Sequence, residues 1–326
     1  MKTTFNIPAS AEEYIEIESE QQLQQLVASG ALRKRNRFIL GGGSNVVFAH
    51  HFEGVVLHAT NRGIRIEEPE GNCDSLRLVT AAAGENWDDF VHFCSSHQCH
   101  GLENLVAIPG DVGAAPVQNV GAYGSEAKDC LYSVRTIDLE EGSVRRFTKE
   151  ECQFAYRDSF FKRHPNRYFV TEVTFALSPT FTPNLSYRPL AEKFGGGKPD
   201  AEEVMAFITD LRWSKLPKPE VLGSAGSFFK NPIVSEAQYK SLLGEYPDLV
   251  AFPAQNGYKL AAGWLIEKAG WKGRKMGRCG VYEKQALVLV NHGGCTGEEL
   301  MELSEHIVAD IERRFHVRLE KEAIVL

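Results

Sequence analysis

The chain has 326 residues, of which 43% are hydrophobic and 24% are charged, and its formal net charge is −7 at neutral pH. This composition is typical of a globular protein, and the length exceeds what one hydrophobic core usually supports, so two or three domains are expected. The negative charge argues against nucleic acid or an anionic membrane as the main partner, but it allows a local basic pocket for a small anion.

The N-terminal residues lack an apolar signal region, and no apolar run is long enough to cross a bilayer. We therefore expect a cytoplasmic protein without membrane contact. The seven cysteines are odd in number and include no C-x-x-C pair, which indicates reduced thiols rather than a framework of disulfides.

The first half of the chain is predicted to consist mainly of strands and turns. Apolar or alternating runs predict strands over residues 38–40, 54–58, 76–80, 133–138, 144–147 and 169–177, with a hairpin about Glu141-Gly142. One helix interrupts them, because large apolar residues recur at the spacing of a buried helical stripe, at Trp87, Phe90, Val91 and Cys94.

That stripe makes Cys94 a core residue. The histidines and cysteines around it do not have the spacing of zinc ligands, so we predict no metal site from His92, Cys94, His97, Cys99 and His100.

Two glycine-rich segments are predicted to hold a large ligand. The apolar run ending at Leu40 is followed by residues 41–45 (GGGSN), which offer bare backbone N–H groups and a hydroxyl to phosphate. The second segment, residues 108–124 (IPGDVGAAPVQNVGAYG), is too irregular for a helix or strand, and its glycines let the backbone approach a cofactor closely. Either segment alone could be an ordinary surface loop. Neither fits the dinucleotide fingerprint G-x-G-x-x-G, because Val46 stands where the third glycine is needed.

The second half of the chain alternates in type. Residues 178–200 are rich in proline and glycine and indicate an inserted loop. A helix with Val204, Phe207, Ile208 and Leu211 on one face should end before residues 215–219, where a domain boundary is expected. Beyond it we predict a helix around residues 260–265, a strand at 286–290, a helix opened by the capping box of Thr296 and Glu299, and a closing strand at 317–325.

Three segments place polar residues where packing does not require them: residues 156–162 (YRDSFFK), 223–232 (GSAGSFFKNP) and 319–322 (LEKE). Taken alone, each has an ordinary explanation. Arg157 next to Asp158 suits a surface ion pair, Ser227 suits a plain turn serine, and Glu322 suits a solvated charge near a terminus.

In chain order, the motifs GGGSN, PGDVGAAPVQNVGAYG, YRDSFFK, GSAGSFFKNP, KLAAGWLIEKAG and LEKE resemble those of the UDP-N-acetylenolpyruvylglucosamine reductases of bacterial peptidoglycan synthesis. The resemblance runs from Asn6 to the C-terminus, and six separated motifs in one order are far harder to match by chance than a single pattern. It implies a flavoenzyme with non-covalent FAD and NADPH as co-substrate. The family reduces the enolpyruvyl double bond of a UDP-sugar to give UDP-N-acetylmuramate.

Such a reaction needs a cation for the carboxylate on which negative charge develops, and a proton source for the adjacent carbon. Arg157 offers the carboxylate a bidentate fork, which lysine cannot supply. The resemblance implies that Ser227 donates the proton and that Glu322, with Arg157, stabilises or protonates the intermediate. An unassisted hydroxyl is a poor acid, and Lys230, three residues on, is a cation that would lower this cost.

The resemblance also implies positions that bind ligands. Tyr187, in the inserted loop, is expected to close as a lid on the substrate diphosphate, as in the subgroup of the family that carries a tyrosine loop. Further residues expected to bind the UDP-sugar are Lys215, Lys230, Asn231 and Gln285. The positions expected to bind FAD are Gly41, Gly42, Gly43, Ser44, Asn45, Pro109, Gly110, Gln118, Asn119, Gly121, Tyr123 and Gly124.

The implied fold is α+β: an FAD-binding module of two subdomains, of the vanillyl-alcohol-oxidase type, followed by an α/β substrate-binding domain. We expect FAD-binding subdomains at residues 1–60 and 61–214, the second with the tyrosine loop at 178–200 inserted. The substrate-binding domain is expected at 215–318, and a C-terminal strand carrying Glu322 at 319–326. The protein is expected to be a monomer.

Two other functions stay open at this point. An oxidase built on the same FAD-binding architecture would use oxygen in place of the sugar nucleotide, although GSAGSFFKNP and the late glutamate count against it. A UDP-sugar sensor without catalysis would keep the fold, although Arg157, Ser227 and Glu322 are all present.

Overall fold

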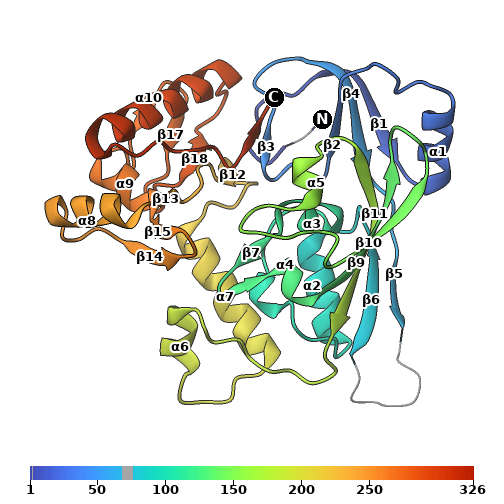
Figure 1. The fold of residues 1–326 in the computed structure, drawn as a ribbon, viewed down its shortest axis with the longest axis horizontal. Coiled ribbons are helices and arrows are strands. Elements are labelled where there is room, and N and C mark those ends of the chain that lie inside the picture. Colours follow the sequence, from blue (N-terminus) through green and yellow to red (C-terminus); the bar gives the residue numbers. More distant parts are fainter. Residues whose placement is uncertain (2, 68–75) are drawn as a thin grey trace. The chain divides into compact units, whose positions relative to one another are not determined.

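The computed structural model describes residues 1, 3–67 and 76–326. It consists of two compact units (Figure 1). The larger unit contains Ala11–Gly42 and Glu53–Arg212, and the smaller unit contains Met1–Ser10, Gly43–Phe52 and Trp213–Leu326. Each unit has a hydrophobic core of its own. The expected division at residues 60, 214 and 318 stays a prediction.

Two sheets form the frame of the larger unit. A three-stranded sheet has the order β1 (Ala11–Ile17), β4 (Phe52–Ala59), β2 (Arg37–Leu40). A five-stranded antiparallel sheet has the order β10 (Val144–Thr148), β9 (Leu131–Asp138), β11 (Tyr168–Leu177), β6 (Arg77–Ala82), β5 (Ile64–Glu67). The predicted hairpin is confirmed, with Val144 opposite Ile137.

Seven helices belong wholly or mostly to the described part of the larger unit: α1 (Glu20–Ala28), α2 (Trp87–Ser96), α3 (Ala115–Gln118), α4 (Ala127–Cys130), α5 (Phe160–Arg163), α6 (Arg188–Phe194) and α7 (Ala201–Lys215). α2 begins where the Asn86 side chain accepts a hydrogen bond from the Asp89 N–H. Its apolar stripe is buried as predicted, and the Trp87 ring packs against Phe90 and Phe175.

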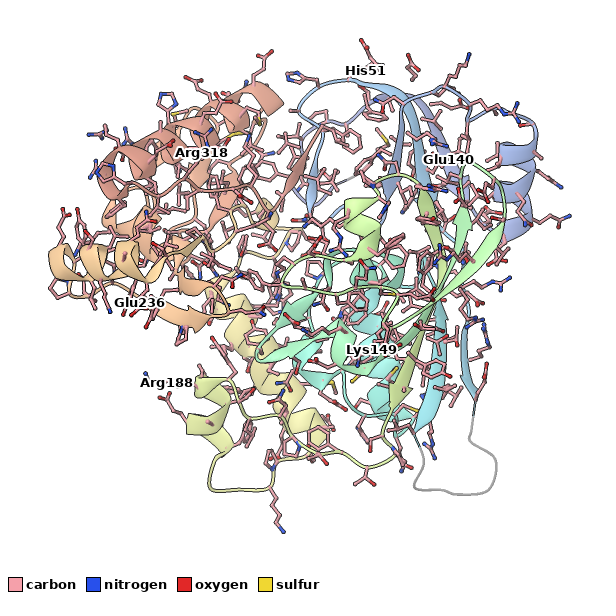
Figure 2. The ribbon with its side chains drawn as sticks, viewed as in Figure 1. His51, Glu140, Lys149, Arg188, Glu236 and Arg318 are labelled. Carbon is pink, nitrogen blue, oxygen red and sulfur yellow. A yellow bond between two sulfur atoms is a disulfide. The ribbon has the colours of Figure 1, made fainter. Side chains whose placement is uncertain are left out.

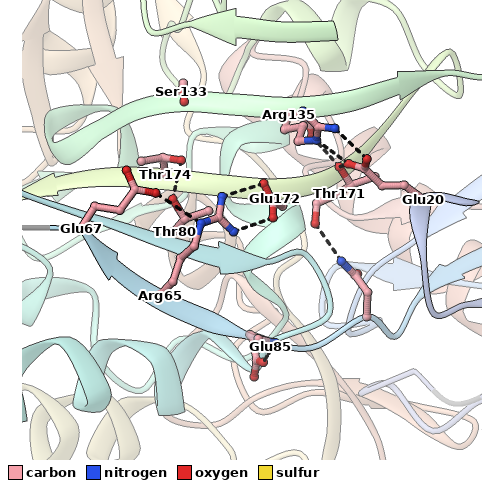
Figure 3. Close-up of polar contacts among 12 residues, drawn as sticks. Glu20, Arg65, Glu67, Thr80, Glu85, Ser133, Arg135, Thr171, Glu172 and Thr174 are labelled. Atoms are coloured by element: carbon pink, nitrogen blue, oxygen red, sulfur yellow. Dashed lines mark hydrogen bonds and ion pairs between the residues drawn. The ribbon is translucent and has the colours of Figure 1, made fainter. Parts of the chain in front are cut away.

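Charged side chains tie these elements together (Figure 3). Glu20, in the first turn of α1, accepts hydrogen bonds from Arg135 of β9 at 2.6 and 2.9 Å and from the Thr171 hydroxyl of β11 at 2.6 Å. Arg65 of β5 binds both carboxylate oxygens of Glu172 on β11, at 2.7 and 3.1 Å. Such bidentate pairs fix geometry as well as charge, so α1 and the edge strand are held in register on the sheet.

The smaller unit contains a four-stranded sheet, a three-stranded sheet and a parallel pair. The four-stranded sheet has the order β12 (Gly223–Ser227), β18 (Val288–Asn291), β17 (Cys279–Val281), β16 (Lys275–Met276). The three-stranded sheet has the order β13 (Ile233–Val234), β15 (Gly257–Leu260), β14 (Ala251–Ala254), and β3 (Val46–Val47) pairs with β19 (Ile324–Val325).

Three helices accompany these strands: α8 (Glu236–Glu245), α9 (Ala262–Lys268) and α10 (Gly297–Phe315). The capping box that predicts α10 is confirmed, because Thr296 Oγ accepts from the Glu299 N–H and the Glu299 carboxylate accepts from the Thr296 N–H. Its predicted inward face is also buried, at Leu300, Leu303, Ile307, Ile311 and Phe315. Other helices carry exposed charged side chains, such as Glu236 on α8 and Arg188 on α6 (Figure 2).

Several local predictions are wrong in part. The segment 178–200 contains the helix α6, which begins with a proline in its first turn and buries Leu190. The segment 108–124 contains a helical turn, α3, also opened by a proline. The closing strand is limited to Ile324–Val325, and Leu260 ends strand β15 instead of lying in α9.

The expectation that all thiols are reduced is also wrong, because Cys279 and Cys295 form a disulfide. Both side chains are buried. Four other cysteines within the described ranges are thiols outside any disulfide: Cys94, Cys99, Cys130 and Cys152. The odd number of cysteines and the lack of a C-x-x-C pair did not indicate this disulfide, whose cysteines lie 16 residues apart.

Within residues 1, 3–67 and 76–326, no helix combines the length and the apolar character that crossing a bilayer requires.

Candidate active site

The two glycine-rich segments meet in the larger unit. A Cβ atom placed on Gly42 would lie 2.8 Å from the Gly110 Cα and 2.9 Å from a carboxylate oxygen of Asp111. A Cβ atom on Gly113 would lie 2.6 Å from that of Ala83. Glycine is therefore required at both places, because the backbones are in contact. The sequence predicts each turn, and the structure adds that the backbones of the two turns are in close contact at Gly42 and Gly110.

The remaining glycine-turn residues, Gly43, Ser44 and Asn45, belong to the smaller unit. Gly43 has a left-handed φ of 66°, and its carbonyl accepts from the Thr4 N–H at 3.1 Å. The Asn45 side chain donates to the Glu322 carbonyl at 3.1 Å, and the Asn45 carbonyl accepts from the Ile324 N–H at 2.9 Å. The turn is thereby joined to the segment that carries the predicted acid.

The loop after α3 has a backbone of unusual conformation. Asn119 and Tyr123 have positive φ angles of 47° and 49°, and Gly124 follows with 86°. The fully buried Asn119 side chain holds the loop, because it donates to the Glu126 carboxylate at 3.0 Å and to the Ala155 carbonyl at 3.1 Å. The side-chain oxygen of Asn119 accepts a hydrogen bond from the Lys128 N–H at 3.1 Å. Non-glycine residues persist in this region only when the surroundings hold them there, and such strain clusters at ligand sites.

Arg157 points toward this loop. Its own φ is 53°, and its Nη2 donates to the Gly121 carbonyl at 2.6 Å. Lys162 donates to the Arg157 carbonyl at 2.9 Å. The neighbouring Asp158 forms an ion pair with Arg163. Arg157 is therefore positioned by backbone contacts, and its guanidinium lies beside the loop expected to bind the cofactor.

Tyr123 and Tyr187 are also brought together. Their rings meet edge to face, with centroids 5.4 Å apart. Burial raises the pKa of Tyr123, and the neighbouring Arg212 lowers it in part through charge and a hydrogen bond. Tyr187 precedes the first turn of α6 as its N-cap residue. The structure thus places the loop tyrosine against the end of the second glycine-rich segment.

Arg212 is a residue that the sequence analysis missed. Burial lowers the pKa of this guanidinium, which Tyr123 and Asp88 raise and Arg157 lowers further. A second arginine therefore lies within electrostatic range of Arg157 in the larger unit, which suits an anionic ligand. A signal was present: Arg212 follows Val204 and Ile208 at intervals of four, so a charge interrupts the apolar stripe of α7.

In the smaller unit, the two other predicted catalytic segments lie side by side. The Glu322 N–H donates to the Phe228 carbonyl at 2.8 Å, and the Lys230 N–H donates to the Glu320 carbonyl at 2.8 Å. Ser227 ends β12 opposite Val288 of β18, beyond an irregularity in the pairing. Gly226 precedes it with φ 65°, and the side chains that follow, Phe228 and Phe229, are fully buried. The backbone of Glu322 thus pairs with the residue directly after Ser227.

Lys230 is engaged in this pairing. Its ammonium group lies 3.1 Å from the Glu320 carboxylate, so the charge of Lys230 is shared with a neighbour of Glu322. The suggested help of Lys230 to the Ser227 hydroxyl stays a prediction.

Asn231 and Gln285 both lie beside the first residues of α9. The Asn231 side-chain oxygen accepts from the Ala262 N–H at 2.9 Å. A Cβ atom on Gly263 would lie 3.0 Å from the side-chain oxygen of Gln285, which also accepts from the Leu287 N–H at 3.3 Å. Lys215 is exposed at the last residue of α7. Two amides expected to bind the same UDP group therefore lie at one helix end.

The larger unit thus carries Arg157, Tyr123, Tyr187 and the joined glycine turns, and the smaller unit carries Ser227, Glu322, Asn231 and Gln285. Glycine at Gly42 and Gly110 lets the backbone approach a phosphate-bearing ligand closely.

Comparisons with known proteins identify both halves. The family described as "FAD binding domain" matches residues 11–148, and the family described as "UDP-N-acetylenolpyruvoylglucosamine reductase, C-terminal domain" matches residues 218–326. The predicted fold, an FAD-binding module followed by a second domain, is confirmed.

Full-length relatives carry one name, UDP-N-acetylenolpyruvoylglucosamine reductase. The protein of that name from Bdellovibrio bacteriovorus is 44% identical, with 98% of this chain and 96% of the relative covered. Those from Bordetella pertussis and Pseudomonas aeruginosa are 45% and 44% identical, with 99% and 98% of this chain and 92% and 94% of the relatives covered. The crystal structure of the reductase from Thermus caldophilus shares the fold, with a TM-score of 0.67 at 23% identity over 99% of this chain and 95% of that one. The chain belongs to the UDP-N-acetylenolpyruvoylglucosamine reductase family.

Proposed function

We propose that this protein is an FAD-dependent oxidoreductase of peptidoglycan synthesis that reduces the enolpyruvyl group of UDP-N-acetylglucosamine enolpyruvate to UDP-N-acetylmuramate, with NADPH as the reductant. The observation that supports the proposal is the backbone pairing of residues 228–230 with residues 320–322, because it brings the segments of the predicted proton donor and the predicted acid side by side. The full-length relatives support the substrate.

The residues that would hold FAD are in the glycine-rich segments. The contact of Gly42 with Gly110 gives a surface of bare backbone for the diphosphate, and the buried Asn119 fixes the loop that leads to Tyr123. FAD, when bound, would supply hydride transfer between NADPH and the sugar nucleotide.

The chain's own residues supply binding and proton chemistry. Arg157 offers two N–H donors to the substrate carboxylate, where charge develops during hydride addition. Ser227 gives its hydroxyl proton to the adjacent carbon, and Glu322 stabilises the same intermediate. Asn231 and Gln285 bind the UDP moiety with Lys215, and Tyr187 covers the diphosphate. One site that accepts NADPH and the sugar nucleotide in turn requires ping-pong kinetics.

The test is to mix the purified yellow protein anaerobically with NADPH and then with the enolpyruvyl sugar nucleotide. We expect flavin bleaching in the first step and recovery of the oxidised spectrum in the second, with one UDP-N-acetylmuramate formed per flavin. A colourless preparation, or flavin reoxidised by oxygen with steady peroxide formation but never by the sugar nucleotide, would refute the proposal and favour an oxidase. Gel filtration with light scattering tests the expected monomer.

A further inference from the structure

We infer that Cys279 and Cys295 form a reversible, redox-responsive cross-link in the smaller unit. Cys279 begins β17, and Cys295 lies directly before the N-cap residue of α10. The disulfide joins residues 16 apart in sequence, with Cα atoms 5.5 Å from each other. A separation of this kind is within the ordinary range for a disulfide.

Other interactions hold the two cysteines in place. Asn291 is the pairing partner of Cys279 on β18, and its side-chain oxygen accepts from the Gly293 N–H at 2.9 Å and from the Cys295 N–H at 3.0 Å. Arg278 pairs with Glu299 of α10 at 3.1 Å. Because these contacts do not involve sulfur, reduction would leave the two thiols side by side, and the bond can form again without rearrangement.

The four other described cysteines lie in the larger unit, and burial disfavours the thiolate form of three of them. Burial raises the pKa of Cys130 to about 11 and that of Cys152 to about 12, and it raises the pKa of Cys94 further. Since the thiolate is the species that reacts, these residues exchange slowly near neutral pH.

Access to the disulfide comes through an exposed turn. His292, Gly293 and Gly294 precede Cys295 and are exposed, and the two glycines have φ of 110° and 70°. A Cβ atom on Gly293 would meet nothing within 4 Å. Local opening of this turn would expose Cys295 before Cys279, which is held within the sheet between β16 and β18.

The oxidation step uses a small-molecule disulfide. The Cys295 thiolate attacks one sulfur of that disulfide and releases one thiolate. The Cys279 thiolate then attacks the Cys295 sulfur of the mixed disulfide, which forms the protein bond and releases the second thiolate. Two protein thiols lose two electrons and two protons, and the small disulfide gains them as two thiols.

Glu299 does not make this place a metal site. Its carboxylate lies within 4.8 Å of both sulfurs, but it already accepts from the Thr296 N–H and pairs with Arg278. In the oxidised protein the two sulfurs are bonded to each other and are not available as thiolate ligands.

The test is a redox titration of the full-length protein in graded mixtures of reduced and oxidised glutathione, followed by denaturing alkylation and intact mass. The reduced protein should take up two more alkyl groups than the oxidised protein, with a single two-electron transition between them. Peptide mapping should link Cys279 to Cys295. Reduction should lower Tm by about 5–10 °C, because a loop of this length constrains the unfolded chain.

Cys279→Ala is the variant and Cys130→Ser the matched control. The Tm of Cys279→Ala should not respond to reductant, and Cys130→Ser should respond as the wild type does. If the wild type takes up the same number of alkyl groups at every ratio, or if Cys279→Ala keeps the full Tm response, the inference is wrong. Flavin binding and turnover do not enter this experiment, so its failure leaves the proposed function untouched.

Discussion

Arg157 has a backbone that its residue type disfavours. With φ 53°, it is held by the Gly121 carbonyl and by Lys162, and these contacts aim the guanidinium at the loop of residues 119–124. Strain of this kind costs on the order of 1–3 kcal/mol and persists where function needs the geometry. The position therefore supports a role for Arg157 in recognising the substrate carboxylate.

We expect Arg157→Lys to reduce kcat about 10²–10³-fold, because lysine keeps the charge but loses the bidentate fork for the developing negative charge. The measurement is steady-state kinetics with the flavin content of each preparation. Arg163→Lys is the matched control, since Arg163 pairs with the neighbouring Asp158 at the surface, and its kcat should stay within about twofold of wild type. Equal loss in both variants would contradict the role of Arg157.

Ser227→Ala separates the two halves of the reaction. Reduction of the flavin by NADPH should keep its wild-type rate, whereas reduction of the sugar nucleotide should slow about 10²–10⁴-fold, because the proton donor is missing. Stopped-flow absorbance of the flavin resolves both steps. An unchanged rate of the second step in Ser227→Ala would exclude Ser227 as the proton donor. A wild-type protein that binds the sugar nucleotide but does not reduce it would favour the sensor function.

At the scale of elements, local patterns predict structure well where the residues involved are close in sequence. The Thr296–Glu299 capping box, the buried stripe of α2 and the β9–β10 hairpin are all confirmed. The helix α6 lies in a segment rich in proline and glycine and was not predicted. Proline in the first turn of a helix is compatible with the helix, whereas proline further along would interrupt it.

Contacts between distant residues could not be predicted from sequence pattern. The meeting of Gly42 with Gly110, the pairing of Glu322 with Phe228 and the Cys279–Cys295 bond depend on how elements pack, which no local periodicity encodes. The family motifs predict which residues bind and react, and the structure gives the local surroundings of these residues within each unit. Convergence of Arg157 with Ser227 and Glu322 stays a prediction.

Glu20 shows how one element is fastened to a sheet, and it predicts a pH dependence of stability. The hydrogen bond from Arg135, with that from Thr171, holds the pKa of Glu20 below its ordinary value, against the opposing effect of burial. The stabilisation is therefore present above the unfolded-state pKa of about 4.3 and is lost as the pH falls through the lower folded-state pKa. Glu20→Gln should reduce the free energy of unfolding by about 1 kcal/mol at pH 7, discounted for partial exposure.

Denaturant unfolding at a series of pH values measures this effect. The difference between wild type and Glu20→Gln should shrink as the pH is lowered toward 3. Glu236→Gln, which removes an exposed pair with Lys240 on α8, should leave the unfolding midpoint nearly unchanged at every pH. A constant difference for Glu20→Gln across the range would rule out the ionised carboxylate as its source.

At the scale of the whole molecule, cofactor binding should stabilise the larger unit. FAD at 100 times its Kd adds about 2.7 kcal/mol to a fold that binds it, which corresponds to a rise in Tm of about 5–10 °C. Gly42→Ala should abolish this rise, because its Cβ would meet the Gly110 backbone at 2.8 Å and force the two turns apart. Gly196→Ala, which has open space around it, is the matched control and should bind FAD normally. Thermal unfolding with flavin fluorescence measures both variants.

The route of the chain through the two units has a consequence for biogenesis. All residues of the larger unit have left the ribosome once Arg212 emerges, so this unit can fold while synthesis continues. Strand β3 precedes most of the larger unit in the chain and its partner β19 follows that unit, so β3 stays unpaired until the larger unit has been made. The Asn45 side chain likewise lacks its acceptor, the Glu322 carbonyl, until residue 322 has been made. A nascent chain therefore carries β3 unpaired while the larger unit is synthesised, and the smaller unit is completed only after the larger one.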